Sequence, residues 1–309
     1  MNTLLQIIVK SYQTYQQPQD KSTFLGISGD GWFTGLVPVF IFIVGYIINK
    51  AIENRKERQR LNELEEYFKQ SVRLLQKPLT RQIDEFLNIS HLLKEKKEQH
   101  LVLKDITNFH VEQIKEISNK DLYSIYIKNR EASILEKTEL YSKLRAGIDF
   151  IDNVRKTMRE KFMMFWESYN KNQNEFKRNI EITDEIFNDL IARSPSPSIQ
   201  ADWLVSGIDK IRLNWISVKD KGIDYMDMYV AKELYLEPLR ELCKQDMRDP
   251  RTAALLKYTM AAIYSFHNID VAKAFFRQQY VLDARGLRKS QIEINKAIAK
   301  FDTIRRVYR

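Results

Sequence analysis

Cysteine is nearly absent from this chain: Cys243 is the only one among 309 residues. A single cysteine cannot form a disulfide within the chain, and it excludes four-cysteine zinc sites and CxxC redox pairs. The scarcity fits a reducing compartment, because disulfide-rich folds belong to oxidising ones.

Glycine (9) and proline (7) are also few, and five of the glycines precede residue 50. The remainder is rich in Lys, Glu, Leu, Ile, Gln and Asn, and it holds few residues that break helices. This composition predicts an all-α fold built from long helices. The high content of Lys, Ile and Asn also favours a bacterial origin in an AT-rich genome.

Signatures of catalysis are missing as well. The sequence has no P-loop, no GxSxG nucleophile elbow and no kinase motif. The glycine cluster at residues 26–35 lacks the spacing of a dinucleotide-binding loop. The histidines, His91, His100, His110 and His267, show no zinc-type spacing. We therefore expect a protein that is not an enzyme and that has neither a cofactor nor a metal site.

One apolar segment without charges runs from Trp32 to Ile48. It reaches the lower limit of about 17 residues for a membrane-spanning helix. It predicts a transmembrane helix over residues 32–52, with aromatic residues near both interfaces. A buried core helix and a signal peptide are the alternatives, but a signal peptide has its basic residues before the apolar run. The residues of the predicted span are Trp32, Pro38, Phe40, Phe42, Tyr46 and Ile48.

The charges on either side of this segment predict its orientation. Residues 1–31 balance to zero, whereas residues 49–60 carry five Lys or Arg against two Glu. The positive-inside rule places the second flank in the cytoplasm. We expect a non-cytoplasmic leader at 1–31, an N-terminus outside, and a cytoplasmic body held at the inner or plasma membrane. The inner-flank anchors are Lys50, Arg55, Lys56, Arg58 and Arg60.

Residues 53–192 predict a cytoplasmic domain of long helices. We expect Pro78 to end or kink the first of them, and further helices at 79–97 and 131–191, with extended character at 99–109. An apolar stripe on the first helix predicts either packing on the body or a coiled-coil seam between subunits, and two heptads do not decide between them. The stripe consists of Leu61, Leu64, Phe68, Val72 and Leu75.

Two prolines spaced by serines predict a linker at 193–199. A basic helical module is expected at 200–309, because residues 193–309 carry 21 Lys or Arg against 14 Asp or Glu. The helices expected in this module are 201–217, 225–245, 251–266, 270–282 and 290–308.

Large and small apolar residues followed by an acid occur within residues 253–284, namely Leu256, Ala262, Tyr264, Ala272, Phe276, Leu282 and Asp283. With this pattern the segment resembles one tetratricopeptide-type hairpin, although Met260, Gln279 and Ala284 depart from it. Such a fold needs about three stacked repeats. The resemblance therefore implies a generic helical hairpin within an interaction module.

The last expected helix has an apolar face and a basic face. A basic amphipathic helix can bind an anionic leaflet, an acidic partner or, less favoured here, a nucleic acid. It can also simply pack by its apolar face with its charges in water. The candidate basic binding face is Arg288, Lys289, Lys296, Lys300, Arg305 and Arg306.

These patterns favour a single-pass membrane-anchored adaptor that recruits an unknown cytoplasmic protein through helical surfaces. The alternative is a self-assembling, membrane-disrupting effector of the pore type, as in a bacterial defence or toxin system. In that hypothesis a homo-oligomer forms through the helix at residues 53–76.

Overall fold

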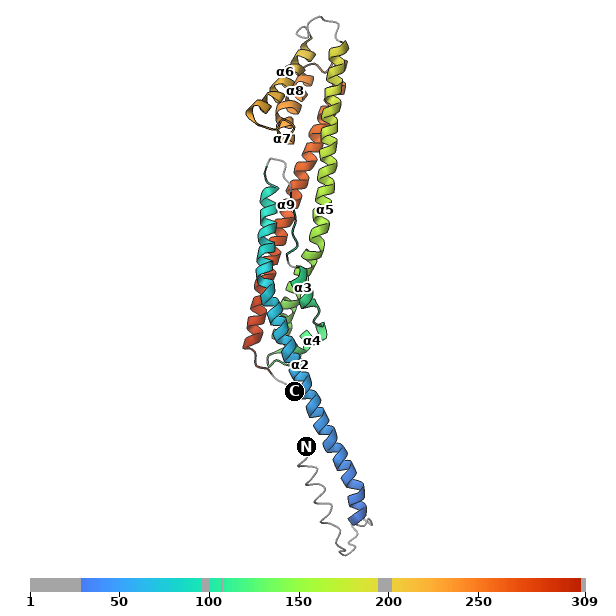
Figure 1. Ribbon diagram of the computed structural model, residues 1–309, viewed down its shortest axis with the longest axis vertical. Helices are drawn as coiled ribbons and strands as arrows, with labels where there is room; N and C mark the ends of the chain where they lie inside the picture. Colours follow the sequence, from blue (N-terminus) through green and yellow to red (C-terminus); the bar gives the residue numbers. More distant parts are fainter. Residues whose placement is uncertain (1–28, 96–100, 107, 194–201, 307–309) are drawn as a thin grey trace. The chain divides into compact units, whose positions relative to one another are not determined.

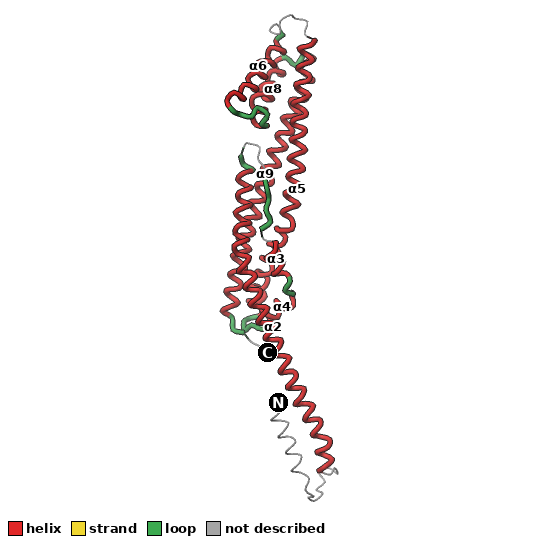
Figure 2. The backbone as a smooth tube through the Cα atoms, viewed as in Figure 1, coloured by secondary structure: helices red, strands yellow, loops and turns green. Residues whose placement is uncertain are grey.

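The computed structural model describes residues 29–95, 101–106, 108–193 and 202–306. Among these residues every regular element is helical, and the only β-type pairing is an isolated bridge between Arg130 and Arg306. Figure 2 shows helices joined by loops, without strands. The predicted all-α class is confirmed. The chain divides into two compact units, Met1–Glu63 and Leu64–Arg309. Residues 1–28 of the leader predicted at 1–31 lie outside the described residues.

Helix α2 (Gly29–Leu92) is one uninterrupted helix that contributes to both units. The expected break at Pro78 does not occur. Proline cannot donate a hydrogen bond to the carbonyl four residues earlier, here that of Leu74. The Leu74 side chain is exposed, so water can reach this turn and satisfy the carbonyl. Two residues before the proline, the side-chain amide of Gln76 donates a hydrogen bond to the carbonyl of Val72 at 3.0 Å.

The core of the larger unit is a pair of long helices, α5 (Ile134–Arg193) and α9 (Pro250–Thr303), which lie side by side (Figure 1). They run antiparallel, because early residues of α5 meet late residues of α9. Phe165 contacts Phe276 with ring centroids 5.2 Å apart, and Phe176 contacts Phe266 at 6.1 Å. Buried aromatic pairs of this kind add to the apolar area that holds the helices together.

The hairpin expected at 253–284 is wrong, because this segment is part of a single helix of 54 residues, α9. Asp249 caps its N-terminus and Pro250 occupies the first turn, where proline is tolerated. No glycine or proline interrupts residues 251–285. At the expected turn, the Asn268 amide instead donates to the side-chain oxygen of Asn172 on α5 at 3.2 Å.

The helices on either side of the linker predicted at 193–199, α5 and α9, belong to one compact unit. Residues 194–201 lie outside the described chain. A group of shorter elements packs beside the N-terminal part of α9, and Tyr235 there donates to Asp184 of α5 at 2.7 Å. These elements are α6 (Trp203–Ser217), η3 (Val218–Lys221), α7 (Met228–Ala231), η4 (Lys232–Leu236) and α8 (Glu237–Gln245).

Short elements connect α2 to α5, namely α3 (Asn108–Lys115), α4 (Asn119–Tyr123) and η1 (Ser124–Lys128). Residues 101–106, within the stretch expected to be extended, form neither a helix nor a strand. The buried Gln82 of α2 holds this stretch, because its amide donates to the carbonyl of Lys104 at 3.0 Å and accepts from the backbone of Ile106 at 2.8 Å.

The buried carboxylate Asp152 joins α3 to α5. It pairs with Lys115 of α3, with Lys156 at 2.9 Å and with Arg155 at 3.1 Å. Burial alone would raise the pKa of Asp152, but the hydrogen bonds from these three cations outweigh burial and lower it to about 2. The carboxylate is therefore ionised at any physiological pH.

Replacing Asp152 by Asn tests this contribution. A carboxyl whose pKa is lowered in the folded state stabilises the fold above its unfolded pKa and loses this effect as pH falls. We expect Asp152→Asn to lower the free energy of unfolding by about 2 kcal/mol at neutral pH. The difference should shrink between about pH 4 and pH 2. Denaturant unfolding followed by circular dichroism measures this, with the exposed Asp149→Asn as control. A difference that does not depend on pH would contradict the assignment.

A second prediction concerns the close approach of α5 and α9 at Gly147. A Cβ added there would lie 2.8 Å from Cγ1 of the buried Ile294. We expect Gly147→Leu to lower the free energy of unfolding by about 1–3 kcal/mol through overpacking, although leucine is the better helix former. The matched control is Ala146→Leu at the exposed neighbouring position, which we expect to change stability by less than about 0.5 kcal/mol. Equal effects in thermal unfolding would contradict this packing.

Candidate functional site

The N-terminal part of α2 presents its apolar side chains outward. From Thr34 onward α2 is long and apolar enough to cross a membrane, and none of its most apolar window is buried inside the chain. Phe40 is 66% exposed and Phe42 is 74% exposed. A core helix of a soluble domain would bury such residues. Pro38, Tyr46 and Ile48 are exposed in the same segment, while the Trp32 side chain lies outside the description.

The five predicted anchors follow this segment on the same helix. All of them are exposed, and Lys50 lies 5.8 Å from the centre of the Tyr46 ring. Arg60 forms a 2.8 Å ion pair with Glu57. The helix thus changes within a few turns from uncharged and apolar to strongly charged. The anchors are Lys50, Arg55, Lys56, Arg58 and Arg60.

The apolar stripe on α2 is mostly hidden within the chain. Phe68, Val72 and Leu75 are buried, and the Phe68 ring meets that of Tyr126 at 5.8 Å. Leu61 is also buried, and Leu64 is partly exposed. This corresponds to the packing interpretation of the stripe. These side chains do not offer a free seam for a second subunit.

Next to this stripe lies a buried ionic cluster centred on Glu65. Its carboxylate contacts Arg130, Lys69 at 2.8 Å and Arg306 at 3.1 Å. Arg130 also donates to the backbone carbonyls of Phe301 and Ile304 at 2.8 and 2.9 Å. The cluster therefore joins α2, the segment before α5 and the end of α9.

Two further groups complete the Glu65 cluster. Asp302 pairs with Lys69. Burial alone would lower the pKa of Lys69, but hydrogen bonds to Asp302 and Glu65 outweigh it and raise the pKa. Tyr126 lies against Arg130, and burial raises the pKa of its hydroxyl. Lys69 therefore stays charged and Tyr126 stays neutral over the whole physiological range.

The predicted basic face divides into two groups. Lys300 pairs with Glu136 at 3.6 Å, Arg305 with Glu131 at 3.9 Å, and Arg306 belongs to the Glu65 cluster. The remaining cations, together with Arg285, are exposed, and none has an ion-pair partner among the described residues. This second group is Arg285, Arg288, Lys289 and Lys296.

The sequence analysis missed an apolar surface on the same helix, which we call the outward stripe: Tyr264, Val271, Phe275 and Leu282. Their spacing of 7, 4 and 7 residues places them on one side of a continuous helix. Tyr264 is 65% exposed and Phe275 is 55% exposed. The signal was present in the sequence, but the expected hairpin assigned 264 and 282 to two different helices and to internal packing.

The outward stripe and three of the exposed cations, Arg285, Lys289 and Lys296, form one surface along α9, because helical spacing places them on the same side. The stripe extends over about 27 Å at 1.5 Å per residue, and Arg285 begins less than one turn after Leu282. The opposite side of α9 carries buried residues such as Phe276 and Tyr280, which face the core. The inner side of α9 is thus buried in the core. Its outer side is apolar along residues 264–282 and basic from Arg285 onward.

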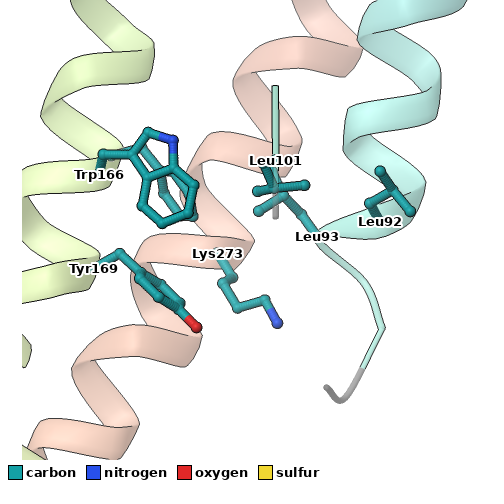
Figure 3. A pocket seen from close by; sticks show the side chains of 7 residues that line it. Leu92, Leu93, Leu101, Trp166, Tyr169 and Lys273 are labelled. Atoms are coloured by element: carbon teal, nitrogen blue, oxygen red, sulfur yellow. The ribbon is translucent and has the colours of Figure 1, made fainter. Parts of the chain in front are cut away.

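A pocket lined by residues of α2, α5 and α9 is too small to bind a ligand. Its cavity of about 10 Å³ holds at most one water molecule. Figure 3 shows Lys273 among its lining residues, and its ammonium donates to the carbonyl of Glu95 at 2.9 Å and to the Tyr229 hydroxyl at 3.0 Å. The Lys273 ammonium is thus held by hydrogen bonds within the fold. The lining is Leu92, Leu93, Leu101, Phe165, Trp166, Tyr169 and Lys273.

Within the described residues, no group of three or more His, Cys, Asp or Glu side chains could hold a metal ion. Cys243 is buried, and burial raises the pKa of its thiol to about 11. No family model, curated protein or solved structure matches the chain. The candidate functional features are therefore the exposed apolar segment of α2 and the outer side of α9.

Replacing Glu65 by Gln tests the ionic cluster that fixes the end of α9. The substitution removes the charge but keeps the size, and it leaves Arg130 buried without its counter-ion. We expect the free energy of unfolding to fall by about 3 kcal/mol or more. The neighbouring, exposed Glu66→Gln serves as control, with an expected change below about 0.5 kcal/mol. Denaturant titration measures both, and indistinguishable midpoints would argue against the cluster.

Proposed function

We propose that this chain is a single-pass membrane-anchored interaction protein whose helical body lies in the cytoplasm and recruits a partner protein. The observation that carries the proposal is the exposed apolar segment of α2, which continues without a break into a helix of the packed body. Such a segment is stabilised by lipid, since about 17–25 apolar residues match the hydrocarbon thickness. The charged flank that follows it supports the orientation with the body inside.

The recruiting role is supported by the outer side of α9. Soluble surfaces rarely keep large aromatic and aliphatic side chains aligned in the open unless a partner covers them. In contrast, nothing in the described residues resembles a catalytic constellation, and the small cavity lined by Lys273 is too small for a ligand. Binding is therefore the activity that the geometry favours.

The pore-type alternative gains no comparable support. It needs the stripe at Leu61–Leu75 to be available for assembly between copies, but Phe68, Val72 and Leu75 are buried in the chain's own core. Opening that core to assemble would expose several large apolar side chains at about 1.5–3 kcal/mol each.

The orientation is tested by introducing one additional cysteine and labelling it with a membrane-impermeant maleimide. Cys243 gives a low background, because its thiol is buried and its pKa is raised to about 11. Maleimides react with the thiolate, so ionisation and access limit labelling. We expect Lys120→Cys, at an exposed position of α4, to be labelled only after the membrane is permeabilised. We expect Ser22→Cys, before the span, to be labelled in intact cells.

The control is the unchanged chain, which should remain unlabelled under both conditions. Labelling of Lys120→Cys in intact cells would reverse the proposed orientation. Recovery of the chain in the soluble fraction, without detergent, would overturn membrane anchoring altogether.

A further inference from the structure

We infer that the outer side of α9 is the docking surface for an acidic amphipathic helix of another protein. This inference rests on the proposed function, and it adds the position of the surface and the chemistry of the partner. Two observations combine in it: the outward stripe, and the free cations that continue directly from its C-terminal end.

The apolar half of the surface fits a helix. Tyr264, Val271, Phe275 and Leu282 form a straight row, with Met260 exposed one turn before them. A partner helix that places residues at i, i+3 or i+4, and i+7 against such a row buries an apolar face along its whole length. Two exposed aromatic rings in the row are the residue type that most often carries binding energy at protein interfaces.

The basic half determines the charge of the partner. Arg285, Arg288, Lys289 and Lys296 are exposed without ion-pair partners in the described chain, and Glu293 is the single acid among residues 285–300. Complementary potentials favour encounter with an acidic segment and disfavour wrong partners. The partner helix is therefore expected to be apolar along one part and rich in Glu or Asp along the other.

The same charges argue against a second copy as the occupant. A second copy would bring an equally basic surface against this one, which like-charge repulsion disfavours. An anionic membrane would satisfy the cations, but it requires no aligned row of side chains, since lipid accommodates any apolar patch.

The test uses the full-length chain in phosphatidylcholine nanodiscs, with the photoreactive residue p-benzoylphenylalanine in place of Phe275. The probe is a synthetic amphipathic helix of about 30 residues, because positions 264–296 span roughly 48 Å at 1.5 Å per residue. Leucines line one face of its first half, and glutamates fill its second half. A matched peptide carries lysine in place of every glutamate. Leu213→p-benzoylphenylalanine, at an equally exposed apolar position of α6, controls for non-specific contact.

We expect the acidic peptide to crosslink at position 275 and not at 213, and the lysine peptide to crosslink at least about tenfold less. Adding Arg285→Glu and Lys289→Glu should lower the yield about fivefold or more. The control pair Lys219→Glu and Lys221→Glu, two exposed cations of η3, should leave the yield unchanged.

Equal crosslinking of both peptides would overturn the inference, as would charge reversals without effect. Crosslinks at 275 to a second copy would assign the face to self-association. Crosslinks to lipid in nanodiscs containing phosphatidylserine, with none to the peptide, would assign it to the membrane. The orientation experiment is independent: if it succeeds while the peptide fails, the anchored interaction protein stands and this docking surface does not.

Discussion

The arrangement of α2, the segment before α5 and the end of α9 depends on the buried carboxylate of Glu65. Glu65 is 3% exposed, and its carboxylate forms ion pairs with Lys69, Arg130 and Arg306. Removing one partner of a buried ion cluster leaves the others uncompensated, so each member requires the rest. Because Arg130 also holds the carbonyls at the end of α9, the cluster fixes where that helix stops. A group buried on α2 therefore holds the end of the helix that carries the basic outer residues.

Helix α9 is shared by nearly every part of this unit. Its inner side contacts α5 along most of its length, as the pairs formed by Gly147 with Ile294 and Phe176 with Phe266 show. Near its C-terminal half it also meets α2, since Gln291 donates to the carbonyl of Gln76 at 3.3 Å. A helix that is rigidly held on one side presents the other side with little loss of entropy on binding. Such pre-organisation is what lets a surface of modest area bind selectively.

The sequence predicted the helical class, the apolar segment and the ends of α5 and α6 within a few residues, because these depend on local composition, spacing and caps. It did not predict that α2 passes through Pro78 or that α9 continues through Asn268. At both positions tertiary contacts or solvent satisfy the hydrogen-bonding groups. The helix therefore continues where a rule based on the local sequence predicts that it ends. It also missed the link between Glu65 and Arg130, which are 65 residues apart. Pairings at such separation leave no periodic trace, and the outward stripe became visible only once α9 was continuous.

In the proposed function, membrane attachment would make a limited docking surface sufficient. A row of four apolar side chains with four adjacent cations is small beside the standard interface, which buries about 800 Å² on each partner. An isolated surface of this size would bind weakly. Confining the chain to a membrane raises its effective concentration toward any partner held at the same membrane, so that weak contacts give a large occupancy. In the function proposed here, the exposed segment of α2 would thus contribute proximity and the outer side of α9 would contribute selectivity.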